Sequence, residues 1–273
     1  MQDWQWQKKQ GISYITVPEW YEQGAFAAFS ARLGGVSNIP CDSLNMGLHV
    51  GDKPHHVLEN RKRFMLAAGG QLDQMVCCQQ VHGDSIKLIN QRHAGFGARK
   101  LETAIGYTDA MVTDVPGVFL TTFYADCFPV YFFDPIKKVV ALAHSGWKGT
   151  MLRIAEKTML TMISEYKSQT EDICCFIGPG IGACCFAIAD DLADRAGHEF
   201  AALNDIIRYN NATCYWDLSA TIQQCLLMAG IKKDQITICP LCTCCNPDHF
   251  YSFRRDQGNT GRMGAVITLL ERD

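Results

Sequence analysis

The chain has 273 residues, of which 48% are hydrophobic and 19% charged, a composition that excludes a disordered protein. Its 25 basic and 28 acidic residues give a net charge of −3, so no global basic surface for nucleic acid is expected. The most apolar stretch, residues 117–133, contains Thr, Asp and Pro, which argues against a membrane span. The first ten residues lack the apolar segment of a signal peptide, so we expect a cytoplasmic protein.

Strand-like runs rich in Val, Ile, Phe and Thr recur along the chain, bounded by Gly, Pro, Asn or Asp. We predict strands at residues 25–29, 75–81, 85–90, 110–113, 118–123, 130–133, 139–144, 173–177, 236–239 and 265–270. Helical spacing and capping signals predict helices at residues 54–68, 151–166, 190–203 and 218–228. Because the strands come in runs of two to four, we expect one α/β domain over residues 1–273, with layered mixed sheets flanked by helices.

Cysteine is unusually frequent, with 14 in the chain, and neighbouring cysteines on a strand point to opposite faces, which disfavours a disulfide between them. Cys239 and Cys242 form a CxxC pair that could be half of a zinc knuckle. A structural zinc site needs a second pair at a suitable distance, and Cys244 and Cys245 are too close together to supply it. We therefore interpret this segment as a buried strand and turn.

His82 and His144 differ from most of the eight histidines because each follows the end of an apolar, strand-like run. Functional groups often lie at strand ends, where the sheet fixes the backbone and the loop gives access. Cys127 lies in a short turn between two apolar strands. Together these three residues predict a catalytic type of Zn²⁺ site with one open coordination position. A nucleophilic Cys–His pair would use the same residues, so both readings stay open.

Residues suited to an anion form a second group. The segment 145–150 joins a strand to a helix and offers backbone N–H groups and Lys148. Arg61 lies in the middle of the predicted helix 54–68, and further arginines lie beside Gly-rich turns. Guanidinium groups in such places suit a phosphate or a carboxylate.

Nine segments in chain order carry a family resemblance. They are SARLGGVS (30–37), SLNMGLHVGD (43–52), ENR (59–61), QQVHGD (79–84), TDAMVT (108–113), ADCFPV (125–130), AHSGWKG (143–149), GPG (178–180) and FRRD leading to TGR (253–262). The chain resembles the polyphenol oxidase (laccase-domain) family, whose members are also described as purine nucleoside phosphorylases and as peptidoglycan editing factors.

The resemblance implies a single α/β domain similar to cysteine-hydrolase-like folds, and a metal-capable site at His82, Cys127 and His144. It implies phosphorolysis of adenosine, inosine, guanosine and methylthioadenosine, together with deamination of adenosine. The partners would thus be a purine nucleoside and phosphate, and the cofactor zinc, with copper as an alternative. On this hypothesis Arg61, Asn45 and Lys148 hold the phosphate, although Lys148 stands where arginine is commoner in the family.

Three other functions remain open from the sequence. In a metal-free cysteine amidohydrolase, Cys127 would be the nucleophile and His144 its base, acting on an amide such as a peptidoglycan precursor. A copper-dependent polyphenol oxidase is less well supported, because the chain has no His-x-His pair to build a multi-copper cluster. A binding module without activity would leave the open coordination position unused.

Overall fold

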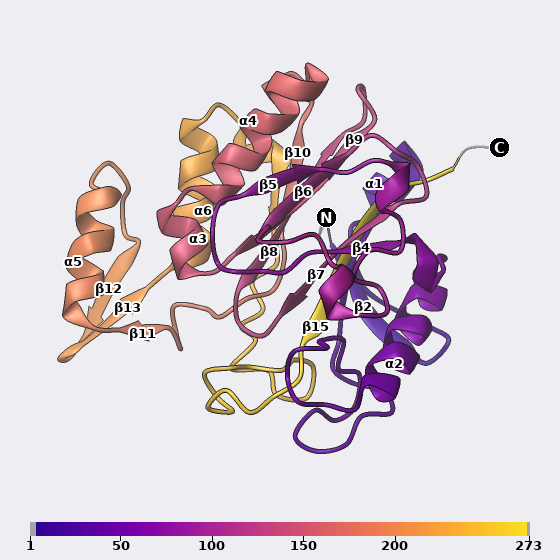
Figure 1. Cartoon of the computed structure of the whole chain (residues 1–273). Helices are drawn as coiled ribbons and strands as arrows, with labels where there is room; N and C mark the ends of the chain where they lie inside the picture. The colour runs from indigo at the N-terminus through magenta and orange to yellow at the C-terminus, as the bar shows by residue number, and fades with distance from the viewer. Residues whose placement is uncertain (1–3, 272–273) are drawn as a thin grey trace.

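Two six-stranded sheets lie face to face in the computed structural model, which describes residues 4–271 (Figure 1). The first sheet has the order β1 (Gln5–Lys9), β2 (Ile12–Thr16), β3 (Ala25–Ser30), β15 (Met263–Leu269), β7 (Phe119–Tyr124) and β4 (Met75–Cys77). The second has the order β14 (Ile236–Ile238), β10 (Cys174–Ile177), β8 (Phe128–Asp134), β9 (Val139–Ser145), β6 (Ala110–Thr113) and β5 (Ile86–Leu88). The pairs β4–β7, β5–β6 and β10–β14 are parallel and the other pairs are antiparallel, which confirms the expected layered, mixed sheets.

The described residues form six helices. They are α1 (Pro18–Gln23), α2 (Pro54–Ala67), α3 (Trp147–Met151), α4 (Ile154–Tyr166), α5 (Asp190–Glu199) and α6 (Leu218–Met228). Helix α2 packs on the first sheet, whereas α3, α4 and α6 pack on the second. A small sheet of β11 (Ala187–Ile188), β13 (Thr213–Trp216) and β12 (Ile207–Asn210) lies beside α5 at one end of the molecule (Figure 1). None of these helices is both long and apolar enough to cross a membrane, as far as the described residues go.

Strand β9 shows how the layers arise from the sequence. Its residues are buried throughout, but alternate side chains enter different cores. Val140 and Leu142 face the space between the sheets, and Ala141 and Ala143 face the helices. By the same alternation, His144 lies on the face that points between the sheets, at the end of the strand.

Some elements differ from the sequence expectation. The hairpin β1–β2 was not predicted because β1 is an exposed edge strand of polar residues, which lacks a strong apolar pattern. The expected helix 151–166 forms only from Ile154 onward, as α4, because Arg153 adopts a left-handed backbone conformation with φ of 57°; Met151 is the last residue of the preceding helix, α3. Both ends of the expected domain 1–273 extend past the described residues.

Candidate active site

Three side chains that are far apart in the sequence meet at one end of the sheet sandwich. The ligand atoms of His82, Cys127 and His144 lie within 4.8 Å of one another. His144 is the next-to-last residue of β9, and Cys127 immediately precedes β8, the strand paired with β9. The rings of His82 and His144 are 4.9 Å apart between centroids. The structure thus brings together the three residues that the sequence pointed to.

Asp109 fixes both histidines and was not identified as a site residue from the sequence. It is fully buried, and its Oδ1 lies 2.9 Å from Nδ1 of His144. The same carboxylate accepts hydrogen bonds from the backbone N–H groups of Val81, His82 and Gly83, which shape the turn that carries His82. A carboxylate that orients a ligating histidine is a common feature of metal sites and of catalytic triads.

Gly146 leaves the space that this arrangement needs. A Cβ atom at this position would lie 2.6 Å from Sγ of Cys127 and 3.3 Å from Cδ2 of His82. Any larger residue would therefore displace the thiol or the imidazole.

Cys127 and His144 shift each other's pKa. Burial raises the pKa of the Cys127 thiol, but the charge of His144 and hydrogen bonds from both histidines outweigh this effect and lower the pKa to about 6. Burial lowers the pKa of His144, and the Cys127 charge and the Asp109 hydrogen bond raise it to about 9. At neutral pH, before any metal binds, the pair is thus a thiolate and an imidazolium.

A cavity of about 670 Å³ opens over these three residues, a volume typical of small-molecule sites. Aromatic rings form part of its wall; they belong to Phe123, Trp147, Phe186 and Phe253. Polar and charged groups project into the same space; they include His49, Arg61, Gln80, Asp126, Arg254 and Arg262. An apolar wall with a few convergent polar groups suits a ligand that has both a flat ring and an anionic part.

Arg61 and Arg262 are cations in this lining without a carboxylate partner in the described part of the chain. Arg61 is 1% exposed, donates to the backbone carbonyls of Met46, Gly97 and Ala98, and lies 4.5 Å from the centroid of the Phe123 ring. Burial lowers the pKa of both arginines. A buried cation that no carboxylate neutralises favours an anionic ligand beside it.

His49 is a further lining residue to which the sequence had assigned no role. Burial and the charges of Arg262 and Arg61 lower its pKa to about 4. Its imidazole is therefore neutral at pH 7 and is able both to donate and to accept a hydrogen bond. His49 lies in the family segment 43–52, but only the fold places it in the same cavity as His82 and His144.

Asn45 and Lys148 lie outside the cavity lining, unlike Arg61. Asn45 is fully buried and bonds to Asp52 Oδ2, the Gly47 backbone and the Arg262 backbone N–H, so its amide is used within the loop. Lys148 is exposed, with its Nζ 5.5 Å from the centroid of the Trp147 ring. The structure therefore does not bring either residue to the place where the sequence hypothesis put the phosphate.

Asp126 supports the wall of the cavity. Its backbone is in the left-handed region, with φ of 87°, which reverses the chain just before Cys127. Its carboxylate accepts hydrogen bonds from the Thr243 hydroxyl, the Ser252 hydroxyl and the Arg254 backbone N–H. It thereby connects the turn that carries Cys127 to the segment that carries Arg254.

The donor set fits a metal ion. Two imidazoles and one thiolate are good ligands for Zn²⁺, and also for copper, and three protein ligands leave a position open towards the cavity. The Asp109 carboxylate supplies the outer hydrogen bond that such histidine ligands usually make.

Comparison with known proteins identifies the family. The profile of the family described as multi-copper polyphenol oxidoreductase laccase matches residues 26–270. The chain belongs to this laccase family. Purine nucleoside phosphorylase YlmD of Bacillus subtilis (strain 168) is 35% identical over 266 residues, which are 95% of each chain. Adenosine deaminase RL5 from an unknown prokaryotic organism is 31% identical over 238 residues, 86% of this chain and 90% of that one.

Solved structures of laccase-family relatives have the same fold. The crystal structure of YlmD from Geobacillus stearothermophilus has a TM-score of 0.92 and 35% identity to this chain, and the match covers 99% of this chain and 100% of that one. The crystal structure of the Bacillus licheniformis protein YfiH gives a TM-score of 0.89 at 37% identity over 94% of this chain and 96% of that one. The names of the curated relatives support an enzyme in this laccase-family member.

Proposed function

We propose that the chain is a cytoplasmic purine nucleoside phosphorylase that acts on adenosine, inosine, guanosine and methylthioadenosine, and that it also deaminates adenosine. The observation that carries this proposal is the His82, Cys127 and His144 group at the base of a cavity lined by both aromatic rings and unpaired arginines. The names of the relatives YlmD and RL5 support the two activities. A reducing compartment suits a site that depends on the Cys127 thiolate.

The cavity offers aromatic rings and cations side by side, since Arg61 lies over the Phe123 ring and Arg254 over the Phe186 ring. The aromatic wall, with Phe123 and Phe186, suits the flat purine, and neutral His49 suits one of its ring nitrogens. Arg61 and Arg262 suit the phosphate, with Arg254 at the rim. This assignment retains Arg61 from the sequence hypothesis. It also retains Arg254 and Arg262, which are among the arginines beside Gly-rich turns, and leaves out Asn45 and Lys148.

Phosphorolysis breaks the bond between C1′ of the ribose and N9 of the purine. A phosphate oxygen forms the new bond to C1′, and the purine leaves with the electron pair, which a proton neutralises. The arginines would hold the phosphate beside C1′ and so lower the entropic part of the barrier. The products are ribose 1-phosphate, or its methylthio analogue, and the free base.

Zn²⁺, or alternatively Cu²⁺, would be held by His82, Cys127 and His144. A bound metal supplies Lewis-acid activation of water, which is the chemistry that deamination at C6 of adenine requires. Asp109 would keep the His144 ring in one orientation throughout, because its carboxylate is fixed by three backbone N–H groups.

Product analysis by chromatography tests this function. The purified protein is incubated with adenosine, and in parallel with inosine, guanosine and methylthioadenosine, with and without phosphate, beside the Cys127→Ala variant. From adenosine we expect adenine and ribose 1-phosphate only when phosphate is present, inosine in both cases, and neither product with the variant. Failure to form any product from the four nucleosides would overturn the purine assignment.

A metal-free cysteine amidohydrolase is the second candidate, because Cys127, His144 and Asp109 form a thiolate, imidazole and carboxylate series. In that case the Cys127 sulfur would attack an amide carbonyl and the protonated His144 would transfer its proton to the departing amine. Water would then hydrolyse the resulting thioester, releasing the acid and restoring the thiolate. Such an enzyme would still hydrolyse an amide-bearing peptidoglycan precursor after all metal is removed. Protection of Cys127 from iodoacetamide in the Zn²⁺-loaded protein, lost when the metal is removed, would exclude this candidate, because a metal-free nucleophile stays reactive.

A further inference from the structure

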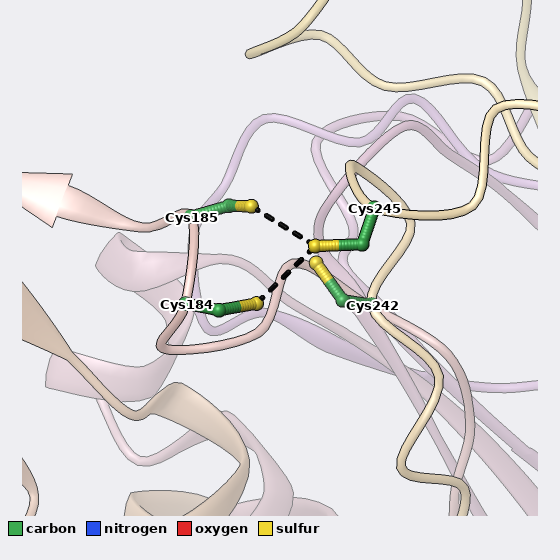
Figure 2. Close-up of side chains that lie close together, drawn as sticks. All are labelled: Cys184, Cys185, Cys242 and Cys245. Atoms are coloured by element: carbon green, nitrogen blue, oxygen red, sulfur yellow. Dashed lines mark hydrogen bonds between the residues drawn. The ribbon is translucent and has the colours of Figure 1, made fainter.

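A second cluster of metal-ligating side chains lies outside the candidate active site. Cys184 and Cys185 belong to the loop between β10 and β11, and Cys242 and Cys245 belong to the segment after β14. Figure 2 shows the four thiols converging from these two segments. All four sulfur atoms lie within 4.8 Å of one another, and Sγ of Cys245 is 3.5 Å from that of Cys184 and 3.3 Å from that of Cys185.

We propose that these four cysteines form a structural Zn²⁺ site that holds one wall of the active-site cavity in place. Zn–S bonds of about 2.3 Å in a tetrahedron place the sulfur atoms ~3.8 Å apart, and the separations of 3.3 and 3.5 Å, with all four atoms within 4.8 Å, are close to this value. Four protein ligands leave no open position, which is the arrangement of a structural rather than a catalytic zinc site. This proposal does not depend on the proposed function of the chain.

The exposure of the cluster argues against an ordinary hydrophobic role for these thiols. Cys184 and Cys245 are exposed, whereas most cysteines of the chain are buried or half-buried. Unliganded cysteine is among the most buried residue types, and exposed thiols oxidise readily. A bound metal ion would satisfy and protect all four.

Backbone groups and cations around the cluster suit negatively charged sulfur. The N–H group of Gly182 donates to Sγ of Cys242 at 3.2 Å, as backbone amides do around thiolate ligands. The guanidinium group of Arg254 donates to the Cys185 carbonyl, and that of Arg255 donates to the Cys244 carbonyl. Arg255 is paired with Asp256, so the Arg254 cation would offset part of the net charge of about −2 that four thiolates and one Zn²⁺ carry.

The cluster is connected to the cavity through both of its segments. Ile181 and Phe186, on either side of the first cysteine pair, line the cavity. Thr243, inside the second pair, donates its backbone N–H to Gly180 and its hydroxyl to Asp126. A metal ion that joins the two segments would therefore fix the aromatic wall opposite His82, while lying outside the reacting groups.

The sequence had suggested half of this site. Two CxxC pairs overlap in this segment, and the four-sulfur group contains Cys242 and Cys245 rather than the expected Cys239 and Cys242. The missing second pair comes from Cys184 and Cys185, about sixty residues earlier, and only the fold brings it near. The sequence interpretation of the segment as a buried strand and turn is therefore wrong for Cys245, which is exposed.

Cobalt binding tests the site without depending on enzymatic activity. Co²⁺ is titrated into reduced, metal-free Cys127→Ala protein, in which the candidate active site no longer offers a thiolate. We expect one Co²⁺ to bind per chain. Its spectrum should show the sulfur-to-cobalt charge-transfer bands and the intense visible bands of a tetrahedral tetrathiolate site, and added Zn²⁺ should displace the Co²⁺. No such absorption, or iron instead of zinc in the protein as purified, would overturn the proposal.

Two substitutions in the same background identify the ligands. Cys184→Ser removes an exposed thiol and so leaves no cavity, and we expect it to weaken Zn²⁺ binding on the order of 100-fold. Cys244→Ser is the matched control, since Cys244 lies next to Cys245 but outside the four-sulfur group, and it should bind Co²⁺ as the parent does. Equal binding by both variants, or a disulfide among the four thiols in freshly reduced protein, would contradict the assignment.

Discussion

At the scale of single residues, one buried carboxylate organises the candidate active site. Asp109 bonds to His144 through its side chain and to His82 through the backbone N–H group. The imidazolium that it stabilises in turn lowers the pKa of Cys127. Asp109 thus contributes to the reactivity of the thiol indirectly, through His144.

The metal-free protein should show this effect as a shifted pH profile of alkylation. The rate for Cys127 follows the fraction of thiolate, so we expect it to rise with a midpoint near pH 6 and to be level at pH 7. The alkylation rate of an ordinary thiol keeps rising until the pH exceeds its pKa of ~8.5. Iodoacetamide labelling followed by peptide mass spectrometry measures each cysteine separately.

The control is Asp109→Asn, which replaces the anionic partner of His144 with a neutral amide. The pKa of His144 should fall and that of Cys127 should rise, so the midpoint moves to higher pH. A wild-type midpoint in the ordinary range would contradict the description of the pair as thiolate and imidazolium.

Arg262 provides a prediction on substrate binding. Arg262→Lys retains the positive charge but loses the planar fork, so we expect the KM for phosphate to rise roughly 10-fold, while phosphate-independent deamination is little changed. Lys148→Ala is the control, because Lys148 is exposed and outside the cavity lining, and its kinetics should match the wild type. If Lys148→Ala raised the KM for phosphate more than Arg262→Lys does, the sequence hypothesis that Lys148 holds the phosphate would be restored.

At the scale of elements, the connection between β9 and α3 determines whether the three ligands can meet. Gly146 lies between His144 and Trp147, where the strand ends and the helix begins. The close approach of the Cys127 sulfur explains why this position has no side chain.

Gly146→Ala should therefore reduce metal binding while the fold is retained. The added Cβ would lie 2.6 Å from Sγ of Cys127, and we expect at least about a 10-fold loss of Zn²⁺ affinity, measured by competition with a chromogenic chelator. Gly197→Ala in α5 is the matched control, because a Cβ there meets no atom within 4 Å. It should leave metal binding unchanged and stabilise the helix by about 0.5–1 kcal/mol.

Helix α4 shows how far local pattern determines an element. Met159 and Met162, at helical spacing in the sequence, are fully buried against the second sheet, as their spacing predicts. The start of the helix was not predictable, since the left-handed conformation of Arg153 is supported by distant contacts with Glu199 and with the Phe200 ring.

At the scale of the whole molecule, the space between the two sheets is one of the cores and also supports the site. Tyr131 donates its hydroxyl hydrogen to the Ala28 carbonyl across this space, so the two sheets are joined by polar as well as apolar contacts. His144 lies at the end of this same interior face.

Leu142→Ala tests the contribution of this core. Leu142 is fully buried between the sheets, so we expect the free energy of unfolding in urea to fall by about 3 kcal/mol. Leu160→Ala is the control on α4, where the residue is 47% exposed, and it should change the stability by less than about 1 kcal/mol. Similar losses for both variants would contradict a packed core between the sheets at Leu142.

The sequence by itself determined the layered α/β class, most of the buried strands, and the trio His82, Cys127 and His144. These features are local, because apolar runs, turn residues and strand ends are readable from neighbouring positions. The tertiary structure alone decided the role of Asp109, the unpaired state of Arg61 and Arg262, and the meeting of Cys184 and Cys185 with Cys242 and Cys245. Each of these depends on contacts between segments far apart in the chain, which only the packing of the two sheets and their loops brings within bonding distance.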